Sequence, residues 1–228
     1  MKKLIAAALL ALTASVIHAE EKVIIALAGD STVANYTKPD IAGWGQVIAK
    51  LFTDNVEIKN FAASGRSTKT FIAEKKWQTL LESKPQYILL QFGHNDSHGK
   101  GRPESTDAST EYKDFLRKYA DDAKNTGARI IFVSPMHRRT FKNGKLTMEL
   151  LPYVNAMKEV AQEKNIPFID LYSSSGALFE SLGDEKSGPL SCKPEDRTHF
   201  SPAGADKMAE LVVEGLKNCG SDITKYLK

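Results

Sequence analysis

The sequence predicts an α/β protein in which one parallel sheet lies between two layers of helices, and three observations support this. Five short apolar runs alternate with five longer amphipathic segments, as in parallel strands joined by crossover helices. The composition is that of an ordinary globular protein, 42% hydrophobic and 26% charged, which excludes disordered and collagen-like chains. No internal repeat or linker divides the 228 residues, so we expect one large domain.

The predicted elements follow one another in regular strand–helix order. Strands are expected at 22–28, 56–61, 87–92, 129–134 and 167–171, and helices at 44–53, 71–83, 109–125, 151–164 and 202–217. The last helix has the clearest start, because Ser201 is a good N-cap and Pro202 suits the first helical position. Two polar interruptions remain, 138–146 with its Asn143-Gly144 turn dipeptide and 183–197. The whole pattern predicts a flavodoxin-like three-layer α/β/α sandwich with a five-stranded parallel sheet.

Residues 1–19 resemble a secretory signal peptide. Lys2 and Lys3 precede an uncharged run from Leu4 to Ile17, and Ala19 offers a small residue at a cleavage site before Glu20. The alternative is a membrane anchor, but a span needs about 20 apolar residues and this run is shorter. We therefore expect export to the periplasm or the outside of the cell, with residues 20–228 as the mature domain.

Charge excludes some partners. Without Lys2 and Lys3 the net charge falls from +3 to +1 over the 209 residues that remain, so a general affinity for nucleic acid loses its support. We also expect no membrane partner and a monomer.

Both cysteines, Cys192 and Cys219, lie in the expected mature chain. An oxidising compartment favours a disulfide between them, and two buried free thiols are the alternative.

Polar, reactive residues follow nearly every predicted strand, where ligands bind in such sheets. Ser31 comes directly after the first strand, and His199 could serve as the base that a serine nucleophile needs. Asp196, three residues earlier, could accept a hydrogen bond from the imidazole and hold its tautomer. The alternatives are that Ser31 only caps a helix, that Asp30 is the acid, or that His137 is the base. Asp30 is adjacent to the serine, so it suits the turn better.

Acyl transfer also needs hydrogen-bond donors for the developing oxyanion. The backbone N–H groups of Ser31 and Gly65 and the side-chain amide of Asn95 come from three different strand ends. The motif Gly-x-Ser-x-Gly is absent from the expected mature chain, which counts against the α/β-hydrolase fold.

Four blocks in order resemble those of the SGNH (GDSL) hydrolase superfamily: Gly29-Asp30-Ser31, Gly65, Gly93-His94-Asn95-Asp96 and Asp196-Arg197-Thr198-His199. The segments Asp30-Ser31-Thr32-Val33, Gly43-Trp44-Gly45-Gln46, Ser64-Gly65-Arg66-Ser67-Thr68 and Asp196-Arg197-Thr198-His199-Phe200 are similar to rhamnogalacturonan acetylesterases. The resemblance implies a cofactor-free serine esterase. It gives Ser31, His199 and Asp196 the triad roles, and Ser31, Gly65 and Asn95 the oxyanion hole.

Other residues invite different interpretations. His94, Asp96 and His98 form a His-x-Asp-x-His pattern, but no further ligand cluster accompanies it, so we expect no metal. We expect Asp96 to support the site by hydrogen bonding. Loop cations are usually solvated, but arginine also holds carboxylates in bidentate fashion, and galacturonate presents one per sugar. The candidates for substrate binding are Arg66, Arg138 and Arg139. Trp44 and Trp77 are expected to be packing residues.

The sequence thus predicts a serine esterase that removes O-acetyl groups from a polysaccharide, pectic rhamnogalacturonan first, through an acetyl-serine intermediate. Two alternatives stay open: an esterase for another acetylated glycan or a lipid or aryl ester, and a non-catalytic glycan-binding protein on the same fold.

Overall fold

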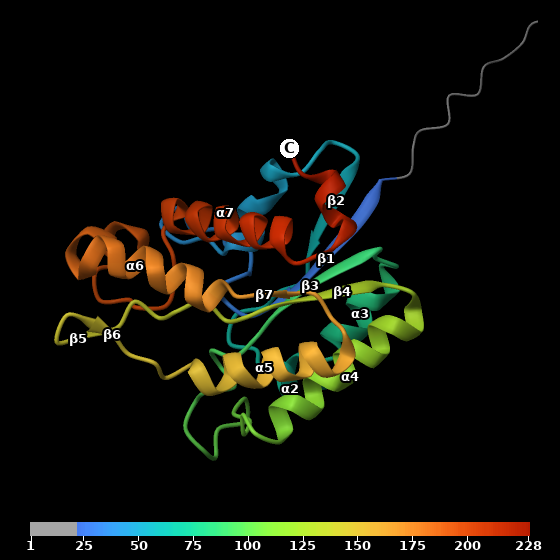
Figure 1. The fold of residues 1–228 in the computed structure, drawn as a ribbon, viewed down its shortest axis with the longest axis horizontal. Helices are drawn as coiled ribbons and strands as arrows, with labels where there is room; N and C mark the ends of the chain where they lie inside the picture. The colour runs from blue at the N-terminus through green and yellow to red at the C-terminus, as the bar shows by residue number, and fades with distance from the viewer. Residues whose placement is uncertain (1–21) are drawn as a thin grey trace, which may run out of the picture.

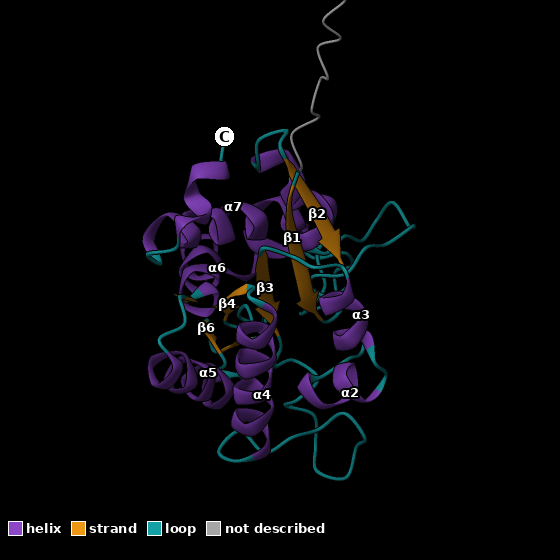
Figure 2. Ribbon diagram, turned by 90° about the vertical axis from the view of Figure 1, so that its right-hand side faces the viewer, coloured by secondary structure: helices purple, strands orange, loops and turns teal. Residues whose placement is uncertain are grey.

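A computed structural model describes residues 22–228, so the expected signal peptide and its cleavage site lie outside the described residues. Its centre is a parallel sheet of five strands in the order β2-β1-β3-β4-β7. These strands are β1 (Val23–Gly29), β2 (Val56–Asn60), β3 (Tyr87–Gln91), β4 (Arg129–Val133) and β7 (Phe168–Ile169). The arrowheads of β1, β2 and β3 point the same way in Figure 2. The sheet confirms the predicted fold class, because this strand order is the flavodoxin-like one.

Helices cover both faces of the sheet (Figure 1). One face packs against α1 (Trp44–Val47), α6 (Leu171–Ser187) and α7 (Pro202–Asn218). The other packs against α2 (Thr68–Ala73), α3 (Lys76–Glu82), α4 (Glu111–Thr126) and α5 (Leu151–Lys164). No helix in the range 22–228 combines the length and the apolar character that a membrane crossing requires.

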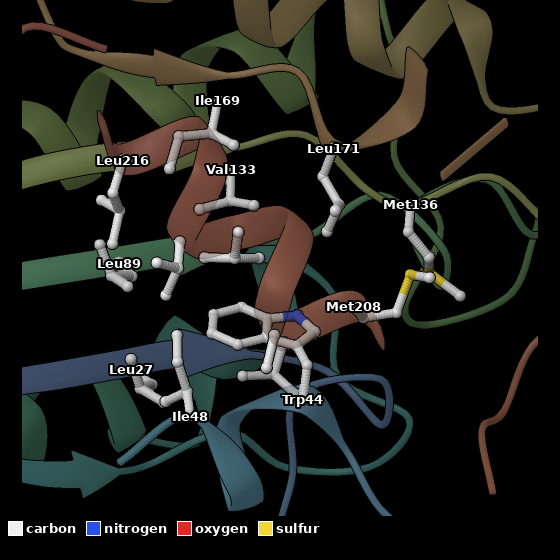
Figure 3. Close-up of a cluster of buried hydrophobic side chains, with 14 of the residues drawn as sticks. Leu27, Trp44, Ile48, Leu89, Val133, Met136, Ile169, Leu171, Met208 and Leu216 are labelled. Atoms are coloured by element: carbon white, nitrogen blue, oxygen red, sulfur yellow. The ribbon is translucent and has the colours of Figure 1, made fainter. Parts of the chain in front are cut away.

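Each face has its own hydrophobic core. Figure 3 shows the core on the α7 side, which includes Trp44, Leu89 and Met208, none of them with exposed surface. Trp77 belongs to the core on the opposite face. Both tryptophans are therefore packing residues, as predicted. Burial of apolar side chains from the strands and the helices holds the three layers together.

Most predicted elements are present, with three differences. The expected helix at 44–53 is α1 followed by the 3₁₀ helix η1 (Ile48–Leu51). The expected helix at 71–83 is two helices, because Lys75 between them adopts the left-handed conformation with φ 59°. The polar stretch 138–146 contains a hairpin of β5 (Phe141–Lys142) and β6 (Lys145–Leu146), with Asn143-Gly144 as its turn.

Helix α6 is a fourth difference, because the sequence pattern predicted no helix at these positions. Asp170 caps it by accepting a hydrogen bond from the Ser173 amide at 3.0 Å, and Gly183 kinks it at φ 74°. Three serines and a glycine in its first turns hide the helical periodicity, since serine and glycine have low helix propensity. The 3₁₀ helix η2 (Gly188–Leu190) follows directly, and η3 (Asp222–Tyr226) comes after α7.

The predicted disulfide is wrong, because both cysteines are free thiols. Cys192 lies beside the start of α7, where its amide donates to the His199 carbonyl at 3.1 Å, whereas Cys219 caps the far end of that helix. A helix of 17 residues is about 25 Å long. A disulfide requires the two Cα atoms to lie within about 7 Å, so α7 itself keeps these cysteines apart.

Candidate active site

Ser31 begins a tight turn at the end of β1, at the edge where β1 and β3 lie side by side. The Asp30 carbonyl accepts hydrogen bonds from the amides of Val33 and Ala34, at 3.2 and 3.1 Å. Asp30 Oδ1 accepts from the amide and the hydroxyl of Thr32, at 2.9 and 2.8 Å. Asp30 therefore shapes the turn that presents Ser31.

His199 and Asp196 reach this serine from the segment before α7. His199 Nε2 lies 2.9 Å from Ser31 Oγ, and His199 Nδ1 lies 2.9 Å from Asp196 Oδ2. Asp196 Oδ1 accepts from the amides of Thr198 and His199, each at 2.8 Å. Although partial burial opposes ionisation, these hydrogen bonds and the neighbouring imidazole hold the pKa of Asp196 below its usual range. Asp196 is thus a carboxylate that accepts the Nδ1–H, and Nε2 is left to accept a hydrogen bond from the Ser31 hydroxyl.

Three candidate hydrogen-bond donors lie in the turns that follow β1, β2 and β3. Asn95 Nδ2 donates one hydrogen to the Arg66 carbonyl at 2.9 Å, which orients the amide and leaves its second hydrogen available. Within residues 22–228, the amide N–H groups of Ser31 and Gly65 have no protein acceptor. Gly65 has φ 79°, in the left-handed region that favours glycine, and this backbone conformation accounts for the residue.

Residues that the sequence analysis did not single out connect these parts. The Tyr36 hydroxyl donates to the Ser31 carbonyl at 2.8 Å and lies 3.2 Å from Ser64 Oγ. Gln91, at the end of β3, donates to Thr32 Oγ1 at 2.6 Å and accepts from the Trp44 indole at 2.8 Å. Tyr36 lies in a loop without a recognisable motif, so no sequence signal pointed to it. Gln91 had one signal, because it is a polar residue at the end of an otherwise apolar strand.

The three candidate arginines have partners within the protein. Arg66 pairs with Glu74 through Nε at 2.9 Å and remains partly exposed. Arg138 contacts Thr198 Oγ1 and donates to the His94 carbonyl at 3.1 Å, so it joins two segments of the site.

Arg139 differs most from the expected substrate contact, because its side chain is buried. It donates to Asp184 Oδ1 at 2.5 Å and to Ser191 Oγ at 2.9 Å. Arg139 thereby braces the segment that leads to His199.

His137 and His98 form their contacts with residues other than Ser31. His137 stacks on Tyr172 with 4.3 Å between the ring centroids, and its Nδ1 lies 2.7 Å from the Arg138 carbonyl. His98 pairs with Glu104 at 2.6 Å. Among residues 22–228, no group of three or more His, Cys, Asp or Glu side chains converges as metal ligands.

Asp96 is buried beside Asn95. Its Oδ1 accepts from the Thr68 hydroxyl at 2.5 Å and the Thr106 hydroxyl at 3.0 Å. Burial raises the pKa of Asp96 to about 7, although the threonine hydrogen bonds oppose this shift. The residue links the loop that carries Asn95 to the start of α2.

Known proteins are similar to this chain in sequence and in fold. The GDSL-like Lipase/Acylhydrolase family matches residues 27–207. Rhamnogalacturonan acetylesterase RhgT of Bacillus subtilis is 38% identical over 218 residues, which cover 88% of this chain and 92% of that protein.

Two solved structures superpose on this fold. The Bacillus subtilis protein YxiM superposes with a TM-score of 0.79 at 29% identity, over 88% of this chain and 58% of that longer one. Axe2, an acetylxylan esterase from Geobacillus stearothermophilus, superposes with a TM-score of 0.69 at 18% identity, over 86% of this chain and 95% of that one. At 18% identity, the similarity to Axe2 concerns the fold alone.

Proposed function

Because the chain belongs to the GDSL-like lipase/acylhydrolase family, we propose that it is a carbohydrate acetylesterase, with acetylated rhamnogalacturonan as its substrate. The observation that carries the proposal is the continuous hydrogen-bonded chain from Ser31 through His199 to Asp196. This chain has the donor and acceptor order that a serine nucleophile requires.

The proposed reaction begins with proton transfer from Ser31 to His199. Ser31 Oγ attacks the acetyl carbonyl carbon while its proton moves to His199 Nε2, and Asp196 stabilises the resulting imidazolium. The tetrahedral intermediate expels the sugar oxygen, which takes the proton from Nε2 and leaves as a hydroxyl. Water then attacks the acetyl-Ser31 ester with His199 again as base, which releases acetate and restores the serine.

Negative charge develops on the acetyl carbonyl oxygen in both steps. We assign its stabilisation to the Ser31 and Gly65 amides and the Asn95 side chain, because these donors have hydrogens to offer and Tyr36 links the turn of Ser31 to Ser64, next to Gly65. A donor of this kind contributes about 3–4 kcal/mol to a transition state. The assignment needs no metal or other cofactor.

The nature of the substrate has separate support. The RhgT relative is named for its action on rhamnogalacturonan and aligns over most of both chains. The His199 side chain is one-third exposed, so the reacting atoms lie near the surface, where a polymer can reach them. An ester on another glycan has weaker support, from acetylxylan esterases that share the fold at 18% identity. A passive glycan-binding role leaves the Ser31–His199–Asp196 chain without a purpose.

We also propose that the enzyme acts after export, in the periplasm or outside the cell. The charged start and uncharged apolar run of residues 1–19 support this. Such a location would give a soluble esterase access to an extracellular polysaccharide.

The test of the proposed function measures chemistry and substrate separately. A fluorophosphonate probe should label wild type at Ser31, and Ser31→Ala should lose labelling and at least ~10⁴-fold of its kcat while keeping its melting temperature. Acetate release should be faster from acetylated rhamnogalacturonan than from acetylated xylan. If the folded wild-type protein is not labelled by the probe, the assignment of Ser31 as the nucleophile is wrong. Faster hydrolysis of octanoyl than of acetyl p-nitrophenyl esters contradicts an acetylesterase.

A further inference from the structure

Asp30 and His94 lie buried beneath the site, and the proposed reaction uses neither. Asp30 precedes Ser31 at the end of β1, and His94 precedes Asn95 at the end of the neighbouring strand β3. A link between these two side chains therefore joins the turn of the nucleophile to the turn of the oxyanion donor.

Their hydrogen-bond partners fix where most of the protons lie. His94 Nε2 is 3.1 Å from the Met136 carbonyl oxygen, and a carbonyl only accepts, so Nε2 carries a hydrogen. Asp30 Oδ1 accepts both hydrogens that Thr32 offers. This leaves Asp30 Oδ2 and His94 Nδ1, which lie 3.4 Å apart. Both atoms are buried, and neither has a hydrogen-bond partner in the described part of the chain.

Without a proton, the carboxylate oxygen and the ring nitrogen would face each other as two lone pairs. Each buried acceptor that lacks a donor lowers the free energy of unfolding, and the low dielectric constant of the interior strengthens the repulsion between the two lone pairs. A single proton between them satisfies both atoms. Within residues 22–228 no cation takes its place at Nδ1, since the guanidinium of Arg138 contacts the His94 backbone carbonyl instead.

We infer that Asp30 and His94 share one proton, and that this bridge positions Ser31 relative to Asn95. The inference rests on the proposed esterase function. The bridge lies in a longer buried network, because Asp30 Oδ1 holds Thr32, whose hydroxyl also accepts from Gln91. Asp30 and His94 are positioning residues, since they act through the turns that carry Ser31 and Asn95.

Two substitutions of His94 separate the bridge from the Met136 contact. The amide nitrogen of asparagine falls near the position of Nδ1, so His94→Asn retains a donor toward Asp30 and loses the bond to Met136. The amide nitrogen of glutamine falls near Nε2, so His94→Gln retains the Met136 bond and loses the bridge. Both variants place a neutral amide in the same buried site, which makes them a matched pair.

We expect His94→Gln to lose about tenfold in kcat on p-nitrophenyl acetate, and His94→Asn to stay within about threefold of wild type, with KM little changed in both. A merely structural role through Met136 would reverse this order. His94→Gln that equals or exceeds His94→Asn in kcat would overturn the inference.

Proton NMR of the wild type tests the bridge without using activity or a variant of His94. We expect a strongly deshielded proton with contacts to the His94 ring that disappears in Asp30→Asn, while the Nε2–H signal remains as an internal reference. Its absence from the wild-type spectrum overturns the bridge. If wild type neither takes the fluorophosphonate probe nor releases acetate, the proposed function fails, whatever the NMR spectrum shows.

Discussion

The hydroxyl of Tyr36 donates a hydrogen bond to the backbone carbonyl of Ser31, at 2.8 Å. The same hydroxyl lies 3.2 Å from Ser64 Oγ, next to Gly65. Tyr36 therefore connects the turn of the proposed nucleophile to the turn of a proposed oxyanion donor. Partial burial raises the pKa of Tyr36, so the phenol stays protonated and able to donate.

Tyr36→Phe removes this hydrogen bond and keeps the ring. One hydrogen bond contributes about 1 kcal/mol, so we expect kcat to fall about fivefold while the melting temperature changes little. Steady-state kinetics on p-nitrophenyl acetate and thermal denaturation measure the two effects. Unchanged kcat would show that the link has no part in positioning Ser31.

Asn95→Ala removes the side-chain donor of the proposed oxyanion hole. We expect kcat to fall by about 10²–10³-fold, because the amide acts on charge that develops in the transition state. Asn95→Asp serves as a control of similar shape that brings negative charge in place of the donor, and it should be at least as impaired. An alanine variant with wild-type kcat would remove Asn95 from the oxyanion hole.

Asp96 should make stability depend on pH. Its folded pKa is raised to about 7 from a usual value near 3.8, so between these values the folded state binds more protons than the unfolded state. The stabilisation that Asp96 contributes is complete below about pH 4 and is lost as the pH rises through about 7. Asp96→Asn cannot ionise, so the difference in melting temperature between wild type and variant should shift in favour of the variant from pH 5 to pH 8. A difference that stays constant with pH would contradict the raised pKa.

The two free thiols should make stability insensitive to reduction. We expect dithiothreitol to leave the melting temperature unchanged, because α7 holds Cys192 and Cys219 at its opposite ends. Thiol titration of the denatured, unreduced protein should find both cysteines reactive. A fall in melting temperature on reduction, with loss of the two thiols before it, would support the disulfide that the sequence first suggested.

The sequence by itself determined the layers and the chain order of the site. Strand runs such as 87–90 are apolar at consecutive positions because both faces of a parallel sheet are covered, and this pattern is local. Ser31, Gly65, Asn95 and the Asp196–His199 pair were candidates for the site because each follows a strand or precedes a capped helix. The carboxyl ends of parallel strands meet at one edge, so positions along the chain were enough to bring them together.

Only the tertiary structure decided which polar groups face each other across the layers. The separation of Cys192 and Cys219 depends on the length and direction of α7, and the burial of Arg139 depends on Asp184 from α6, a helix without a clear sequence signal. The contact between Asp30 and His94 joins residues 64 positions apart. The shared proton is inferred because the other polar atoms of both side chains already have hydrogen-bond partners, which leaves Oδ2 and Nδ1 facing each other. Periodicity records which side of an element is apolar, whereas hydrogen-bond partners are set by the packing of elements distant in sequence.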